Sequence, residues 1–390
     1  MSRRYAYSRR GFLGVIGSSS LLGLAAPFLP KTSAWALPPA NDVRFAYVAS
    51  DAEDAGGIYV FRVKGLAWTL VQSVASESPS SLALSADQTT LFVANRRRNY
   101  QGRPTASVEA YRIDRRSGSL RLLSRRPLAL SAIGPEHVAV SPNGKYLVVS
   151  VTAGGAYNLV PIDHEGKLGS VTILRKGIGA SIHPEQRSAK PQQVIFDRRG
   201  RLISSDLGCD RINVLQLEGD SLIALQRNSV EPGSGPAAIE LNPQCSTLFV
   251  GGALDGTITA YAYDEAHGRI LTPMASTKAF SRPADGRLHA LAIHPSGELV
   301  MAAWSDQRSH NVSSWRFNRK DGSFETGDTL KVQGATKVLR FFPRGDSLVA
   351  VDATNGVISS LRCDEASGIL GSMAQLASTQ SPSAICFTYL

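Results

Sequence analysis

Four polar side chains stand where short apolar segments begin, and their types suit the binding of an oxygen-rich small molecule. His137 follows Gly134-Pro-Glu, and Gln192, His289 and Lys337 hold comparable places at later apolar runs. An imidazole titrates near neutral pH and can take a proton from water, while an ammonium group or an amide binds oxygen atoms. We therefore expect a basic, hydrogen-bonding bowl that suits a carboxylate, a phosphate or a sugar.

Polar loops add a second group of candidates. The segment Asp206-Leu-Gly-Cys-Asp-Arg places Asp206, Asp210 and Arg211 in one loop, and Trp304 is expected in the corresponding loop of a later unit. These side chains enlarge the hydrogen-bonding capacity expected of the bowl. Structural alternatives remain open for several candidates: His137 could hold a strand, Lys337 could be a solvated lysine at a rim, and Asp206 with Asp210-Arg211 could form a turn and an ion pair.

Several kinds of site are missing from the sequence. The seven histidines show no metal-ligand spacing, and neither CxxC nor CxxCH is present. The chain has no G-x-S-x-G elbow, P-loop or dinucleotide fingerprint. We therefore expect neither a metal nor a cofactor.

One sequence unit recurs after residue 40, and it must position these candidates. Each copy is an apolar strand, a turn with Pro or Asp and often Gly, and a second apolar strand. Copies begin at residues 82, 138, 194, 239, 291 and 338, and most continue into an alternating strand such as Ile258-Thr-Ala-Tyr-Ala-Tyr. Four short strands in a period of about 50 residues are typical of a β-propeller blade.

The two ends of the chain complete a seventh unit. Residues 45–49 and 58–63 resemble the second and third strands of a blade, and residues 383–387 resemble a lone first strand. We therefore predict an all-β fold, a single seven-bladed β-propeller of four-stranded blades over residues 37–390. Its first blade is closed by the C-terminal strand, because closure pairs strand edges that would otherwise stay open.

Residues 1–36 predict an export signal. They combine the basic head Ser8-Arg9-Arg10-Gly-Phe-Leu with an apolar middle and an Ala34-Trp-Ala36 end, a pattern that resembles the twin-arginine signal. We expect a periplasmic or extracellular protein with no stable membrane insertion after cleavage; an uncleaved anchor is the alternative. Residues 37–390 hold 37 basic and 32 acidic residues, too small an excess to indicate a nucleic-acid partner.

From about residue 45 to residue 387 the sequence resembles the seven-bladed lactonase family, which includes bacterial 6-phosphogluconolactonase and a fungal muconate-lactonising enzyme. Asp206-Leu-Gly-Cys-Asp-Arg-Ile-Asn-Val is close to the family's D-L-G-x-D-R-[IV]-x-V, and Gly233-Ser-Gly-Pro matches its G-x-G-P. Ile182-His-Pro-Glu-Gln-Arg resembles its N-P-E-R-Q segment, and His137 matches the histidine of its P-x-H.

Other positions depart from the family's pattern. The family's arginine falls at Ala237 and its glutamate at Ala253, and two common histidines fall at Lys190 and Gln192. Lys337 lies near a family arginine and keeps its positive charge.

The resemblance implies hydrolysis of a sugar lactone or carboxy-lactone, which would be the small-molecule partner. In that interpretation His137 activates water, while Lys337 or Arg187 holds the carbonyl oxygen or a carboxylate. The expected substrate-binding residues are Gln192, Asp206, Asp210, Arg211, His289 and Trp304. The alternative is a catalytically inactive propeller that binds a ligand or a protein, which the departures at Ala237 and Ala253 favour.

Overall fold

The structure is a computed structural model, and it describes residues 43–52, 56–219, 221–281 and 286–389. The export signal expected over residues 1–36 lies outside the described residues. Among those that are described, no helix is long and apolar enough to cross a membrane.

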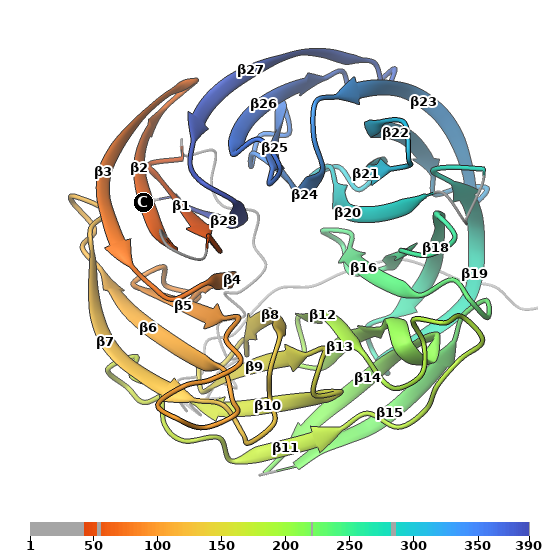
Figure 1. Cartoon of the computed structure of the whole chain (residues 1–390). Helices are drawn as coiled ribbons and strands as arrows, with labels where there is room; N and C mark the ends of the chain where they lie inside the picture. Colours follow the sequence, from red (N-terminus) through yellow and green to blue (C-terminus); the bar gives the residue numbers. More distant parts are fainter. Residues whose placement is uncertain (1–42, 53–55, 220, 282–285, 390) are drawn as a thin grey trace, which may run out of the picture. The chain divides into compact units, whose positions relative to one another are not determined.

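Seven antiparallel sheets of four strands form a ring, as Figure 1 shows, and the predicted seven-bladed propeller is confirmed. The strands of blades one to four, from the innermost outward, have the following bounds. Blade one is β28 (Pro382–Thr388), β1 (Phe45–Ser50), β2 (Gly57–Lys64) and β3 (Ala67–Ala75); blade two is β4 (Pro79–Leu84), β5 (Thr90–Asn95), β6 (Ser107–Ile113) and β7 (Leu120–Pro127); blade three is β8 (Pro135–Val140), β9 (Tyr146–Val151), β10 (Ala156–Pro161) and β11 (Ile173–Lys176); blade four is β12 (Pro191–Phe196), β13 (Leu202–Asp206), β14 (Arg211–Glu218) and β15 (Ser221–Ser229).

Blades five to seven repeat the same order, and the short 3₁₀ helix η1 (Leu207–Cys209) follows β13 in blade four. Blade five is β16 (Pro236–Leu241), β17 (Thr247–Gly252), β18 (Thr257–Asp264) and β19 (Arg269–Lys278); blade six is β20 (Arg287–Ile293), β21 (Leu299–Ser305), β22 (His310–Asn318) and β23 (Ser323–Val332); blade seven is β24 (Thr336–Phe341), β25 (Ser347–Asp352), β26 (Val357–Cys363) and β27 (Leu370–Ser378).

The recurring turn between the first two strands of a blade follows directly from its sequence. In blade three Gly144 has φ 70°, a left-handed conformation that glycine adopts without strain, and its N–H donates to the Ser141 carbonyl at 2.8 Å. The Ser141 hydroxyl accepts from the Tyr146 N–H at 3.0 Å. The Ser-Pro-Asn-Gly segment therefore fixes where the innermost strand ends and the second begins.

The core lies between neighbouring blades. All six residues of β5 are buried, because a second strand is covered on both faces by adjacent sheets, whereas β3 at the outer edge alternates between exposed and half-buried residues. Blade one closes as predicted: Ala46 pairs with Phe387 across β1 and β28, and Figure 1 shows these two strands side by side. The ring of blades positions the seven innermost strands around one central channel.

Candidate functional site

A cavity of about 340 Å³ occupies the central channel, and residues from all seven innermost strands line it. Its volume lies in the range of small-molecule sites, which usually measure about 300–1,000 Å³. The cavity is therefore large enough for a monosaccharide-sized ligand.

Each innermost strand carries a β-bulge near its start. In β8 the pairing with β9 shifts between Pro135 and His137, and in β24 the pairing with β25 shifts between Thr336 and Val338. Equivalent shifts occur in the other five blades. A bulge leaves one residue unpaired and turns its side chain, and here two successive residues of a strand reach the cavity, such as Glu136 and His137.

The structure brings together four of the predicted residues. His137, Gln192, His289 and Lys337 all line the channel cavity. Gln192 donates through Nε2 to the Thr152 hydroxyl at 3.2 Å. These four residues come from four different blades, so only the closed ring places them around one space.

Both channel histidines are neutral at neutral pH. Burial lowers the pKa of His137 to about 4, and the positive charge of Arg340 acts in the same direction. Burial also lowers the pKa of His289 to about 4, with Arg287 the next cause and weaker contributions from His310 and Lys337. Nε2 of His289 lies 2.7 Å from the Ser305 hydroxyl, whereas Nδ1 of His137 is buried without a hydrogen-bond partner in the described chain.

The sequence analysis missed a carboxylate and a guanidinium in the same cavity. Glu240 of β16 and Arg340 of β24 both line it, three register positions beyond the bulge. Burial raises the pKa of Glu240 to about 7, although Arg340 opposes the shift. Glu240 is half-buried and Arg340 is exposed, and both side chains line the channel cavity. Ionised carboxylate and carboxylic acid therefore coexist near neutral pH.

The repeat itself contained the signal for these two residues. The five equivalent positions hold small or apolar side chains, namely Ala83, Ala139, Ile195, Ala292 and Cys386. A charged residue at this position of an otherwise apolar strand has to face the channel, because the residues on either side of it face the core.

The cations of the cavity differ in how they are neutralised. Arg96 forms ion pairs with Glu136 at 3.0 Å and with Asp51 at 3.7 Å. Arg287 is paired with Glu185 at 2.9 Å. In the part of the chain that the structure describes, Lys337 and Arg340 form no ion pair. The cavity thus presents two uncompensated cations to a ligand.

Asp210, Arg187 and Trp304 do not line the channel cavity. Asp210 is buried, and its carboxylate accepts hydrogen bonds from Gln186 Nε2, Gly233 N and Gly235 N, each at 2.7 Å. It therefore ties the loop of residues 177–190 to the loop before β16. Arg187 follows the buried Gln186 and is itself exposed.

Trp304 belongs to the packing between blades. Its indole N–H donates to the Ser313 hydroxyl at 2.9 Å, and its ring lies 5.8 Å from that of Phe280, centroid to centroid. The remaining two predicted residues, Asp206 and Arg211, line a separate cavity of about 190 Å³ between blades three and four.

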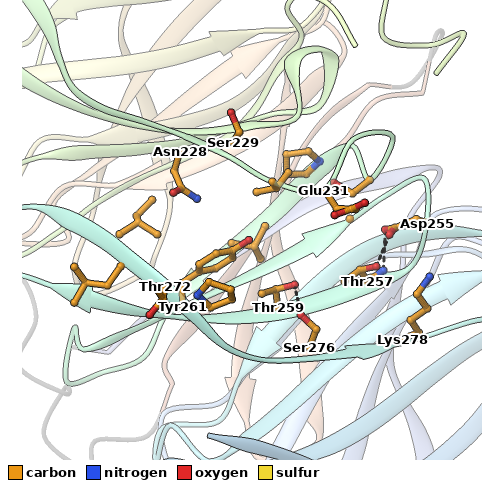
Figure 2. A pocket seen from close by; sticks show the side chains of 18 residues that line it. Asn228, Ser229, Glu231, Asp255, Thr257, Thr259, Tyr261, Thr272, Ser276 and Lys278 are labelled. Carbon is orange, nitrogen blue, oxygen red and sulfur yellow. Dashed lines mark hydrogen bonds between the residues drawn. The ribbon is translucent and has the colours of Figure 1, made fainter. Parts of the chain in front are cut away.

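A larger cavity of about 1220 Å³ is not the channel. Figure 2 shows this open groove, which β15 of blade four and β18 and β19 of blade five line. It is rich in hydroxyl groups, such as the Thr259 and Ser276 pair at 2.9 Å. It contains no histidine and none of the predicted residues, so size alone does not make it the candidate site.

Nothing in the described chain resembles a metal centre, since no group of three His, Cys, Asp or Glu residues there can hold an ion. The channel instead combines hydrogen-bond donors, two cations outside ion pairs, two neutral imidazoles and one carboxyl group that titrates near neutral pH. Such a set can bind an oxyanion and move a proton.

Comparison with known proteins identifies the family of this chain. The profile of the family described as "Lactonase, 7-bladed beta-propeller" matches residues 45–387. The 6-phosphogluconolactonase of Bacillus subtilis (strain 168) is 22% identical over 80% of this chain and 87% of that protein. A 6-phosphogluconolactonase of Formosa agariphila is 24% identical over 72% of this chain and 81% of its own.

Solved structures share the fold. The periplasmic gluconolactonase of Pseudomonas aeruginosa superposes with a TM-score of 0.80 at 23% identity, covering 89% of this chain and 99% of that one. A putative 6-phosphogluconolactonase from Bacteroides fragilis gives 0.78 at 20% identity, covering 90% and 99%.

Proposed function

Because the chain belongs to the lactonase family of seven-bladed β-propellers, we propose that it hydrolyses a sugar lactone or carboxy-lactone in its central channel. The observation that carries this proposal is the meeting of Glu240, Arg340, His137 and Lys337 around one cavity. These groups supply a proton acceptor and two cations, which are what lactone hydrolysis requires.

The departures from the family's pattern lie in the wall of the same cavity. Ala237 and Ala253, where the family carries an arginine and a glutamate, both line the channel. Glu240 and Arg340 restore one carboxylate and one guanidinium to that cavity from other positions. We therefore propose that the chemistry is retained with its charged groups relocated deeper in the channel.

The proposed reaction starts with a water molecule held between Glu240 and His137. Glu240 accepts a proton as the water oxygen attacks the carbonyl carbon, and the developing oxyanion is stabilised by Lys337 or Arg340. Collapse breaks the bond to the ring oxygen, which takes the proton back from Glu240, and the product is a hydroxy acid. Glu240 suits this role better than His137 because its pKa of about 7 lies closer to neutral pH than the value of about 4 for His137.

Two of the roles expected from the sequence change in this proposal. His137 becomes the group that orients the water, through a neutral imidazole, rather than the principal base. Arg187 is exposed and outside the channel cavity, so Arg340 replaces it as the guanidinium that faces the carbonyl oxygen or a carboxylate.

An unphosphorylated substrate fits the proposed location. The sequence of residues 1–36 supports export by the twin-arginine route, and one structural relative is a periplasmic gluconolactonase. A phosphorylated sugar made in the cytoplasm suits an exported protein poorly, so an aldonolactone or a carboxy-lactone is the better candidate.

The test measures the rate of lactone hydrolysis by the mature chain, residues 37–390. The lactone that remains is quantified by hydroxamate trapping. The panel contains an aldonolactone, its 6-phosphate and a carboxy-lactone. We expect turnover of an unphosphorylated substrate, a loss of about 10²-fold or more in Glu240→Gln, and full activity in the surface control Arg121→Gln. Arg121 is exposed on β7 and distant in the fold from the channel strands.

A rate equal to that of buffer on every lactone would replace this proposal by its alternative. The channel would then act as a binding site in a catalytically inactive propeller, an interpretation that Ala237 and Ala253 support. Retention of binding in an inactive wild type would be measured by calorimetry with the corresponding sugar acid.

A further inference from the structure

The cavity between blades three and four is separate from the channel. It has a volume of about 190 Å³, and none of its lining residues lines the channel cavity. Its walls come from β10 and β11 on one side and from the end of β13 with β14 and β15 on the other; Figure 1 shows β11 and β15 as neighbouring outer strands. We call it the side cavity.

Four cations surround the side cavity. They are Arg175 and Lys176 of β11, Arg211 of β14 and Arg227 of β15. In the described part of the chain none of the four forms an ion pair. Like charges gathered around a space of this size repel one another, so an anion inside it would relieve the repulsion.

The single acidic group of the side cavity is already occupied. Asp206 is buried and accepts a hydrogen bond from the Lys190 N–H at 2.8 Å, with further bonds from Gly208 and Cys209. Burial raises the pKa of its carboxyl group, although these hydrogen bonds oppose the shift. Asp206 therefore serves the loop around η1, forms no ion pair in the described chain, and its single charge cannot balance four cations.

Two of the arginines are held in place by backbone carbonyls. Arg175 donates to the Leu222 carbonyl, and Arg211 donates through Nη1 to the Ile178 carbonyl at 3.1 Å. A guanidinium has five N–H groups, so each arginine keeps donors for a ligand. Arginines fixed in this way lose little conformational entropy when an anion binds.

Neutral hydrogen-bonding groups complete the side cavity. Asn213 pairs with Arg227 across β14 and β15, and Tyr157 pairs with Arg175 across β10 and β11. Asn213 Nδ2 lies 3.4 Å from the Tyr157 hydroxyl, so the two sides of the cavity meet at these groups. Arginine recognises phosphate and sulfate groups through pairs of parallel hydrogen bonds.

We propose that the side cavity binds a tetrahedral oxyanion of the phosphate or sulfate type, either as the free ion or as the anionic group of a larger molecule. The ligand lies against Arg175, Arg211 and Arg227, with Lys176 at the rim. This site is independent of the lactone chemistry proposed for the channel, because the two cavities share no residue.

The test is isothermal titration of the mature chain with inorganic phosphate, sulfate and phenyl phosphate, at constant ionic strength set with sodium chloride. We expect saturable binding of the oxyanions and a loss of about tenfold or more in affinity for Lys176→Gln/Arg227→Gln. Lys176 and Arg227 are exposed, and their substitution should leave the melting temperature in chloride unchanged. Arg121→Gln is the control for a lost surface charge, and Lys337→Gln/Arg340→Gln the control for binding in the channel.

The phenyl phosphate arm distinguishes the two sources of the anion. Tighter binding of the ester than of inorganic phosphate indicates a group on a larger molecule, and equal or weaker binding indicates the free ion. The proposal is overturned if no oxyanion binds above the chloride background, or if the double variant binds as tightly as the wild type. A loss equally large in Lys337→Gln/Arg340→Gln would also overturn it, since the binding would then belong to the channel.

Discussion

Glu240 and Arg340 occupy the same register position of two innermost strands, β16 and β24, and face one channel. They are not joined by an ion pair, yet the positive charge of Arg340 lowers the pKa that burial raises in Glu240. The carboxyl group therefore titrates near neutral pH instead of being held ionised. This relationship allows Glu240 to be protonated or ionised as a reaction or a ligand demands.

The stability of the protein should depend on the ionisation of Glu240. In the folded chain its carboxyl group keeps its proton up to a pH of about 7, whereas the unfolded chain releases it near the model value of 4.5. The folded state then binds more protons between these values, so its free energy of unfolding falls as the pH rises through this window. Glu240→Gln lacks this loss, and its melting temperature should rise relative to wild type between pH 5 and pH 8.

The same experiment with Arg340→Gln provides the matched control. Removing the cation should raise the pKa of Glu240 further, which extends the loss of stability to higher pH and makes it larger. A constant difference in melting temperature between Glu240→Gln and wild type across the whole range would contradict the titration assigned to this residue.

Asp210 should control the loop of residues 177–190. Its carboxylate accepts from Gln186 in that loop and from Gly233 and Gly235 before β16. Asp210→Asn replaces an accepting oxygen by a donor and should cost about 1–3 kcal/mol, because buried N–H groups lose their partner. Asparagine tolerates the left-handed φ of 49° at this position, so the backbone is not strained by the change.

Limited proteolysis and urea denaturation measure the effect of Asp210→Asn. We expect faster cleavage within residues 177–190 and a lower midpoint. Asp306→Asn is the control, since among the described residues the Asp306 side chain accepts hydrogen bonds from Arg308 and Ser309 of its own loop. Equal rates of cleavage in wild type and Asp210→Asn would contradict the role of Asp210 in holding this loop.

The fold was predictable because every blade carries the same pattern of strands and turns in its sequence. The alternation of buried and exposed positions and the turns with Gly144 or Gly297 recur in almost every unit, so an error in one copy is corrected by the others. The lone strand at residues 383–387 was interpretable for the same reason: its pattern matches the first strand of every other blade. The pairing of Ala46 with Phe387 confirms that interpretation.

The candidate site was less predictable, because it depends on departures from the repeat. His137 and Lys337 could be placed at the channel from their positions at strand starts. Asp210 belongs to a family motif and Trp304 was expected in a loop, so both were assigned to the ligand. Instead the Asp210 carboxylate accepts from Gln186, and the Trp304 indole donates to Ser313. The sequence does not show whether a loop side chain points to the cavity or into the protein. For a polar side chain this depends on which buried hydrogen-bond donors need a partner.

Export should require the paired arginines at the start of the chain. Replacing Arg9 and Arg10 by lysine keeps the charge but removes the twin-arginine pattern. We expect the precursor to accumulate in the cytoplasm, and the wild-type mature chain to begin at Leu37 when its N-terminus is sequenced. Normal export of the lysine variant would contradict the proposed route, and an N-terminus far from Leu37 would contradict the cleavage site.

Closure of the ring should depend on the side chain of Phe387. This residue is buried, and its ring lies 5.3 Å from that of Phe342 in blade seven and 6.1 Å from that of Trp68 in blade one, centroid to centroid. It therefore packs on both sides of the seam between the two ends of the chain. Phe387→Ala removes those contacts and should cost about 3–5 kcal/mol.

Deletion of residues 380–390 should cost more than Phe387→Ala, because it also removes the hydrogen bonds of β28 to β1. Since each blade packs on its neighbours, the loss should lower the unfolding transition of the whole ring, not only of blade one. Urea denaturation followed by tryptophan fluorescence measures both variants, with Phe387→Leu as the conservative control. A truncated chain that unfolds at the midpoint of the full chain would show that β28 does not hold the ring closed.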